Sequence, residues 1–96
     1  MAASPIDRIR DAVLAGRYRF SGHGLDELDA DRLHPIDVES ALLTGKVTRT
    51  QRDEPTVPGP RYNVIGTATD LATKVAVICR FEPRRELLII TCYEIE

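Results

Sequence analysis

Four side chains of this 96-residue sequence are candidates for chemistry on a charged substrate: one histidine, two arginines and one tyrosine. His23 has an ordinary pKa of about 6.5, which suits a general acid or base near neutral pH. Arg61 and Arg80 carry guanidinium groups, which donate paired hydrogen bonds to phosphate oxygens, and Tyr93 could stack or donate beside them. The alternative interpretation of His23 is a structural histidine in the first turn of a helix.

Other reactive residue types lack the spacing that chemistry needs. His23 and His34 have no C-x-x-C or H-x-x-x-H partners, so we expect no metal ion and no cofactor. His34, which precedes Pro35, suits a helix cap or the surface. Cys79 and Cys92 lie inside apolar runs, where free thiols behave as small hydrophobes, so we expect them to be reduced rather than joined in a disulfide.

Composition indicates one soluble domain spanning residues 1–96. Hydrophobic residues make up 43% and charged residues 29% of the chain, and no apolar run approaches the roughly 18 residues of a membrane span. The N-terminus lacks the features of a signal peptide, which predicts a cytoplasmic protein without membrane contact. The net charge of -2 argues against binding nucleic acid through overall charge, although it leaves room for a local basic patch.

The positioning elements follow from caps, periodicity and turn residues. Ser4 and Pro5 begin a helix that Gly16 ends, and Pro35 begins another that Gly45 ends. The remaining expected elements are a short strand at 17–20, a helix at 21–30, strands at 46–51 and 61–67, and two apolar strands at 75–81 and 87–95. A proline-rich loop without regular structure is expected at 52–60.

This order predicts an α+β fold with helices on one face of a four-stranded antiparallel meander sheet, and a short extra strand near the N-terminus. The two hairpin turns set the expected register. A two-residue tip at Arg84 and Arg85, together with a tip at Asp70 and Leu71, predicts the following pairs on the core face: Phe81 with Leu88, Cys79 with Ile90, Val77 with Cys92, Tyr62 with Cys79, and Val64 with Val77.

The other face is then expected to place Arg80 beside Ile89, Ile78 beside Thr91, Ala76 beside Tyr93, Arg61 opposite Arg80, and Asn63 opposite Ile78. One sheet face therefore collects Arg61, Asn63, Arg80, Thr91 and Tyr93. Opposed arginines repel each other, so either an acidic neighbour such as Glu82 or Glu94 neutralises them or the pair forms an anion site. Both interpretations remain open from the sequence.

Several motifs carry a family resemblance. They are F-S-x-H at 20–23, Arg32, the helix pattern at 33–43, R-Y-x-V-x-G at 61–66 and I-I-T-x-Y at 89–93. Together they resemble an uncharacterised small bacterial domain family related in fold to the RelE, ParE and BrnT toxins. The resemblance covers residues 18–95. The chain departs from the family motif after the histidine, where it has acidic residues and Leu28 instead of a methionine and a second arginine.

The resemblance implies a RelE/BrnT-like toxin-type ribonuclease, or an inactive relative, that cleaves or binds RNA without a metal ion on the open sheet face. It points to His23, Arg61, Thr91 and Tyr93, whereas Arg80 and Asn63 follow from the register alone. The implied partners are RNA and a small antitoxin-like protein. The alternative is a non-catalytic module that binds a protein partner through the sheet face or the strand at 46–51, or a homodimer that buries Ile65, Ile78 and Ile89.

Overall fold

The computed structural model describes residues 4–52 and 59–96. Its elements, in chain order, are α1 (Pro5–Leu14), β1 (Tyr18–Phe20), α2 (Gly22–Ala30), α3 (Pro35–Thr44), β2 (Lys46–Gln51), β3 (Arg61–Thr67), β4 (Lys74–Phe81) and β5 (Leu87–Ile95). The α+β class is therefore confirmed, and each expected helix and strand is present. The expected loop at 52–60 lies mostly outside the described residues.

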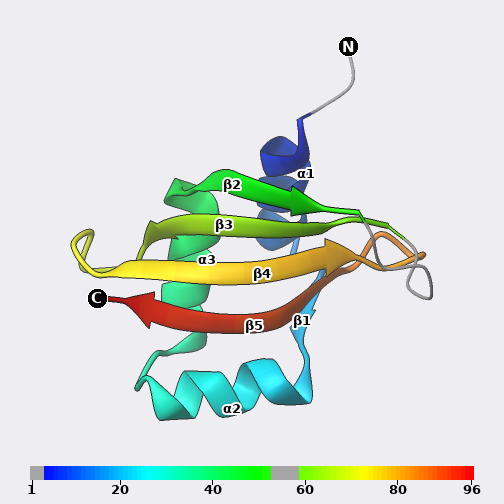
Figure 1. Cartoon of the computed structure of the whole chain (residues 1–96). Coiled ribbons are helices and arrows are strands. Elements are labelled where there is room, and N and C mark those ends of the chain that lie inside the picture. The colour runs from blue at the N-terminus through cyan, green and yellow to red at the C-terminus, as the bar shows by residue number, and fades with distance from the viewer. Residues whose placement is uncertain (1–3, 53–58) are drawn as a thin grey trace.

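The sheet has five strands in the order β1-β5-β4-β3-β2 (Figure 1). Strands β2 to β5 form the expected antiparallel meander. The expectation of a four-stranded sheet is wrong, because β1 joins the same sheet and pairs in parallel with β5, with Arg19 opposite Leu88. The sheet is therefore mixed.

The three helices do not all cover one face. Helices α1 and α3 lie on the same face of the sheet, whereas α2 runs along its β5 edge (Figure 1). Two polar contacts tie α2 and the residues beside it to that edge: Ser21 Oγ donates to the Ile90 carbonyl at 2.7 Å, and Asp31 Oδ2 accepts from the Glu94 amide at 2.8 Å. These contacts satisfy backbone groups that would otherwise leave the edge open to another strand.

The helix caps follow the sequence signals. Ser4 Oγ accepts from the Asp7 amide at 3.3 Å, and Ser21 Oγ accepts from the Gly24 amide at 3.0 Å. Gly24 is a poor helix former, but this position in α2 requires glycine. A Cβ there would lie 2.9 Å from the Ile89 carbonyl oxygen. The absence of a side chain lets α2 approach β5 closely.

The β4–β5 register agrees with the prediction over only part of its length. Val77 opposite Cys92, Ile78 opposite Thr91 and Ala76 opposite Tyr93 are confirmed. Toward the turn the pairing shifts by one residue, so that Cys79 lies opposite Ile89, Arg80 opposite Leu88 and Phe81 opposite Leu87. The predicted pairs of Phe81 with Leu88, Cys79 with Ile90 and Arg80 with Ile89 are therefore wrong.

A longer turn causes this shift. The Arg85 amide donates to the Glu82 carbonyl at 2.8 Å and the Glu82 amide donates to the Glu86 carbonyl at 2.9 Å, which leaves three residues at the tip instead of two. Arg85 has φ 64, as the last residue of a three-residue hairpin loop requires. A bulge at Ile90 then restores the expected register for the rest of β5.

The bulge changes which residues of β5 reach the core. Leu87 and Ile89 are fully buried in the core cluster between the sheet and the helices, where Leu88 and Ile90 had been expected. Leu88 pairs with Arg80 on the face of the sheet opposite α1 and α3, and it is buried outside that cluster. Cys79 and Cys92 are buried and free, as predicted. No described helix is long and apolar enough to cross a membrane.

Candidate functional site

The face of the sheet opposite α1 and α3, here called the open face, gathers five of the six expected site residues. The β3–β4 pairs Tyr62 with Cys79 and Asn63 with Ile78 are confirmed, as is Val64 with Val77. Alternation along the strands then places the following side chains on the open face: Arg61 and Asn63 from β3, Arg80 from β4, and Thr91 and Tyr93 from β5. Tyr93 is 43% exposed and lies opposite Ala76.

Arg61 and Arg80 are the centre of this face. Tyr62 pairs with Cys79 in an antiparallel ladder, so the next positions outward on the two strands are Arg61 and Arg80. No ion pair within 4.0 Å and no side-chain hydrogen bond joins either guanidinium to another residue in 4–52 or 59–96. The Nε atoms of both arginines and Oδ1 of Asn63 are buried and find no hydrogen-bond partner among the described residues.

Unpartnered buried polar atoms are costly, typically about 1–3 kcal/mol each. Three of them on adjacent strands of one sheet face therefore point to a group that is supplied from outside the described chain. Two guanidinium groups need acceptors, and phosphate oxygens match their fork of donors. The arrangement is chemically suited to binding an anion.

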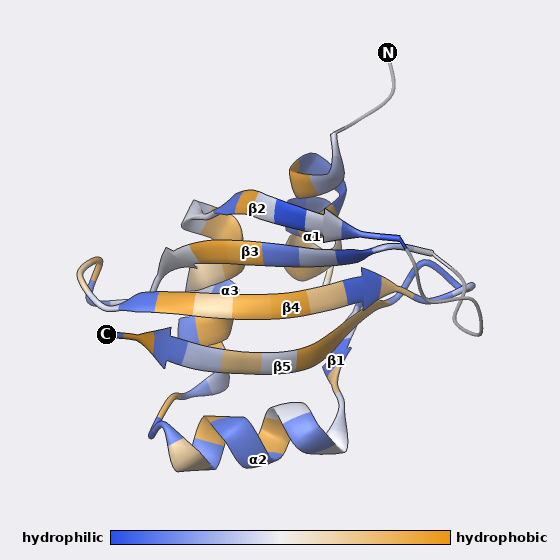
Figure 2. Cartoon of the chain, viewed as in Figure 1, coloured by the Kyte–Doolittle hydropathy of each residue, from blue (hydrophilic) through white to orange (hydrophobic). Residues whose placement is uncertain are grey.

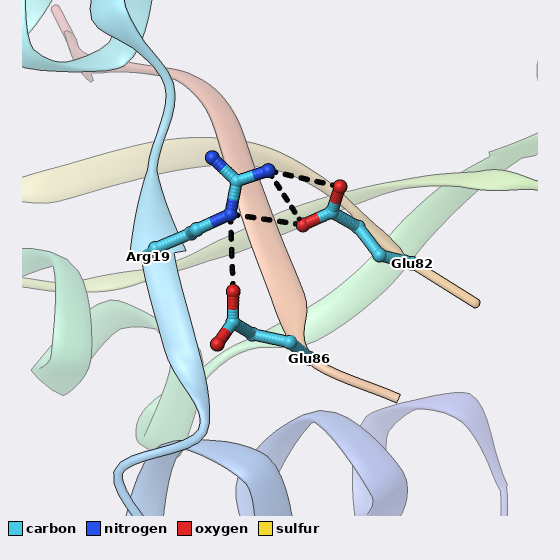
Figure 3. A network of polar contacts seen from close by, with 3 residues as sticks. All are labelled: Arg19, Glu82 and Glu86. Atoms are coloured by element: carbon cyan, nitrogen blue, oxygen red, sulfur yellow. Dashed lines mark hydrogen bonds and ion pairs between the residues drawn. The ribbon is translucent and has the colours of Figure 1, made fainter. Parts of the chain in front are cut away.

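The acids that were the alternative to an anion site, Glu82 and Glu94, do not pair with the arginines. Figure 3 shows Arg19 of β1 holding both Glu82 and Glu86. Arg19 Nε and Nη2 donate to the two Glu82 oxygens at 3.0 and 2.9 Å, and Arg19 Nε lies 3.0 Å from Glu86 Oε1. Glu94 pairs with Val75, so alternation directs it away from the open face. Neither Glu82 nor Glu94 forms an ion pair with Arg61 or Arg80.

Strand β2 adds cations that sequence reasoning missed. Lys46 lies opposite Ile65 and Arg49 opposite Asn63, which places both on the open face. They are three positions apart, so simple alternation would separate them, but a bulge at Thr48 brings them to the same side. Lys74 of β4 shares this face by its parity with Ala76 and Ile78. No signal in the β2 sequence marks the bulge.

Positive charge gathers on the open face. Lys46, Arg49, Arg61, Lys74 and Arg80 lie on the open face, whereas α2 and α3 contain aspartate and glutamate but no lysine or arginine. Figure 2 shows the apolar middle of β4 between hydrophilic ends. A chain of net charge -2 thus has a basic patch, the exception that the overall charge had left open.

His23 stands apart from the arginine pair. It lies in the first turn of α2 with its side chain 65% exposed, and its Nε2 is 3.6 Å from Glu27 Oε1. Helix α2 flanks β5, so β4 and β5 separate it from Arg61 on β3. No polar contact within the described residues connects His23 to either arginine.

The cysteines are not candidate nucleophiles. Burial raises the pKa of Cys79 to about 12, and burial together with the nearby carboxylates of Glu27 and Asp31 raises the pKa of Cys92 to about 11. Both are thiols rather than reactive thiolates at neutral pH. In the part of the chain that the structure describes, no three His, Cys, Asp or Glu side chains form a group that could hold a metal ion.

Comparison with known proteins identifies a family. The model of a domain of unknown function, DUF4258, matches residues 20–94, which include β1's last residue, α2, α3, the open face and His23. Neither the curated proteins nor the solved structures contain a match to the chain. Helix α1 lies outside the matched region. The match covers most of the sequence, and the chain therefore belongs to the DUF4258 family.

Proposed function

We propose that the open face binds single-stranded RNA. The observation that carries this proposal is the Arg61 and Arg80 pair, for which residues 4–52 and 59–96 supply no carboxylate within ion-pair distance and no acceptor for the buried Nε atoms. RNA phosphates supply those acceptors, and Lys46, Arg49 and Lys74 extend the positive charge along the same face. Exposed Tyr93 offers a surface on which a base can stack.

The finer proposal is metal-free RNA cleavage by a RelE/BrnT-like toxin-type ribonuclease. It is supported by the sequence resemblance and by the exposed imidazole of His23. His23 would take the 2′-hydroxyl proton, the 2′-oxygen would attack the phosphorus, and an acid would protonate the departing 5′-oxygen, leaving a cyclic phosphate. Because β5 lies between His23 and the arginine pair, Arg61 and Arg80 would hold a phosphate farther along the same RNA strand rather than the one that is attacked.

This step requires the RNA to cross β5, because His23 and the arginine pair lie on different sides of that strand. Thr91 and Tyr93 lie on β5 along this path, and their side chains donate no hydrogen bond to other described residues. They are therefore free to contact the ribose or the base between the two groups. Asn63 Oδ1, for which the described residues supply no donor, would accept from the same nucleotide.

Binding and cleavage are tested with one labelled single-stranded RNA. Fluorescence anisotropy at several salt concentrations should show affinity that falls steeply with salt, and Arg61→Ala or Arg80→Ala should reduce the slope of log K against log salt by about 0.7 to 1. Arg32→Ala is the matched control, because it removes the same charge from the loop after α2 and leaves the open face intact. Gel analysis of the same RNA with His23→Ala tests cleavage separately.

The second candidate function is binding of a protein partner, such as a small antitoxin-like protein. The observation that favours it is the position of β2 at the edge of the sheet, where the described chain places no further strand. The homodimer alternative loses part of its basis, because Ile89 is fully buried in the core and Ile65 and Ile78 are only half-exposed. If the wild-type chain binds no RNA at low salt, partner binding through β2 replaces the RNA proposal.

A further inference from the structure

A second basic feature lies on the helix side of the sheet, away from the open face. A cleft of about 400 Å³ opens between α1 and the β4–β5 turn, and it is lined by Arg8, Asp11, Ala12, Arg17, Phe81 and Arg85. Its volume falls in the range of small-molecule sites, which is roughly 300–1,000 Å³. Three guanidinium groups and one carboxylate line it, so its walls carry two more positive than negative charges.

No carboxylate of the described residues forms an ion pair with any of these three arginines. The ion pairs of the described residues involve only Arg19 and His23, so Asp11 lies in the same cleft as Arg8, Arg17 and Arg85 without an ion pair to any of them. Three adjacent cations without paired acids repel one another. An anion bound between them would relieve that repulsion.

The cleft is held in shape before any ligand binds. Arg8 Nη2 donates to the hydroxyl of Tyr62 at 3.1 Å, and the Arg8 guanidinium lies 5.2 Å from the centre of the Phe81 ring. This contact uses one of the five N–H donors of the guanidinium. Arg8 is thereby fixed in position with donors left for a ligand, which reduces the entropy lost on binding.

The other two arginines have fixed backbones and exposed side chains. The Arg17 amide donates to the Ala12 carbonyl at 2.8 Å, and the Arg17 carbonyl accepts from the Leu87 amide at 2.9 Å, so this residue is anchored between α1 and β5. Arg85 occupies the positive-φ position of the turn. The three-residue loop therefore sets the position of Arg85 at the mouth of the cleft.

We propose that this cleft binds a phosphate monoester. A dianionic phosphate matches the excess of two positive charges, and guanidinium groups bind phosphate oxygens in pairs. Ala12 and Phe81 supply apolar walls for an organic group attached to the phosphate, which inorganic phosphate lacks. Two sources share this chemistry, a free nucleotide and the 5′-phosphate end of an RNA. The site does not depend on the open face, because its residues lie on the other side of the sheet.

Titration calorimetry with the full chain tests the proposal, with adenosine 5′-monophosphate, adenosine, and a short RNA carrying either a 5′-phosphate or a 5′-hydroxyl as the probes. We expect the monophosphate to bind and adenosine not to bind. Arg17→Ala and Arg85→Ala should each weaken binding about tenfold, the typical value of one charge-assisted hydrogen bond. Asp11→Asn should tighten binding, because Asp11 is the one carboxylate among the described residues that line the cleft.

Arg84→Ala is the matched control, since Arg84 is a neighbour of Arg85 in the same turn but does not line the cleft. Tighter binding of the 5′-phosphorylated RNA than of the 5′-hydroxyl RNA, lost in Arg17→Ala, would identify an RNA end as the ligand. Equal binding of the two RNAs, with the monophosphate still bound, would identify a free nucleotide. The proposal is overturned if the monophosphate shows no saturable binding at millimolar concentration. It is also overturned if Arg84→Ala weakens binding as much as Arg17→Ala, which would indicate attraction by overall charge.

Discussion

Gly66 on β3 lies directly against the backbone of α3, and replacing it by alanine tests how the two layers pack. A Cβ at Gly66 would lie 2.1 Å from the Ala41 carbonyl oxygen and 2.8 Å from its carbonyl carbon. The first distance is 1.3 Å shorter than the 3.4 Å at which ordinary contact begins. The obstructing atoms belong to the backbone of a helix, so a side-chain rotation cannot relieve the overlap.

The cost follows from this geometry. Overpacking a core costs about 1–3 kcal/mol when side chains can adjust, and a displaced helix places Gly66→Ala at the upper end, at about 3 kcal/mol. In a domain of this size, each kcal/mol lowers the melting temperature by about 4–8 °C. We therefore expect Gly66→Ala to melt about 12–24 °C below the wild-type protein.

Circular dichroism during heating measures this difference. Gly22→Ala is the matched control, because a Cβ on this first residue of α2 meets no atom within 4 Å. Alanine there favours the helix by up to about 1 kcal/mol, so this variant should melt at or slightly above the wild-type temperature. The packing argument fails if Gly66→Ala melts within a few degrees of the wild type.

Three further predictions concern individual side chains. Cys79 and Cys92 should not react with a thiol reagent in the native protein at neutral pH, and both should react once it is unfolded, because their raised pKa values keep them as thiols. Asp37→Ala should cost about 1–2 kcal/mol in urea unfolding at neutral pH, since Asp37 caps α3 and accepts from the Thr69 amide and hydroxyl at 3.1 and 2.8 Å. Those hydrogen bonds lower the pKa of Asp37, so its contribution should be present above about pH 4, the unfolded value, and should disappear as the pH falls through the folded pKa. Arg19→Ala should change stability by less than about 1 kcal/mol in the same assay, because its side chain is 53% exposed.

Local signals in the sequence were sufficient to predict most elements of the fold. Ser4, Ser21 and Pro35 mark the helix starts, and the apolar runs mark β4 and β5. The parallel pairing of β1 with β5 was not predictable in the same way, because three residues of alternating pattern carry no information about a partner that lies almost seventy positions away. Only the packing of the whole chain selects that partner.

The site was predictable where simple alternation holds and was missed where it fails. Arg61, Asn63, Thr91 and Tyr93 lie on the expected face because β3 and the far half of β5 are regular. A three-residue turn and a bulge disturb the rest. Arg85 takes a positive φ without the glycine that usually signals it, and the bulge in β2 brings Arg49 onto the open face. The cleft depends on how α1 docks against the β4–β5 turn, which no periodicity encodes.

The salt dependence of single-stranded RNA binding tests the central proposal most directly. We expect wild-type protein to bind RNA at low salt with a negative slope of log K against log salt, and the Arg61→Ala, Arg80→Ala double variant to reduce that slope by about 1.4 to 2, because each phosphate contact contributes about 0.7 to 1. Arg32→Ala should leave the slope unchanged. Absence of RNA binding by the wild type at low salt, or equal slopes in the wild type and the double variant, would contradict the assignment of RNA binding to the open face.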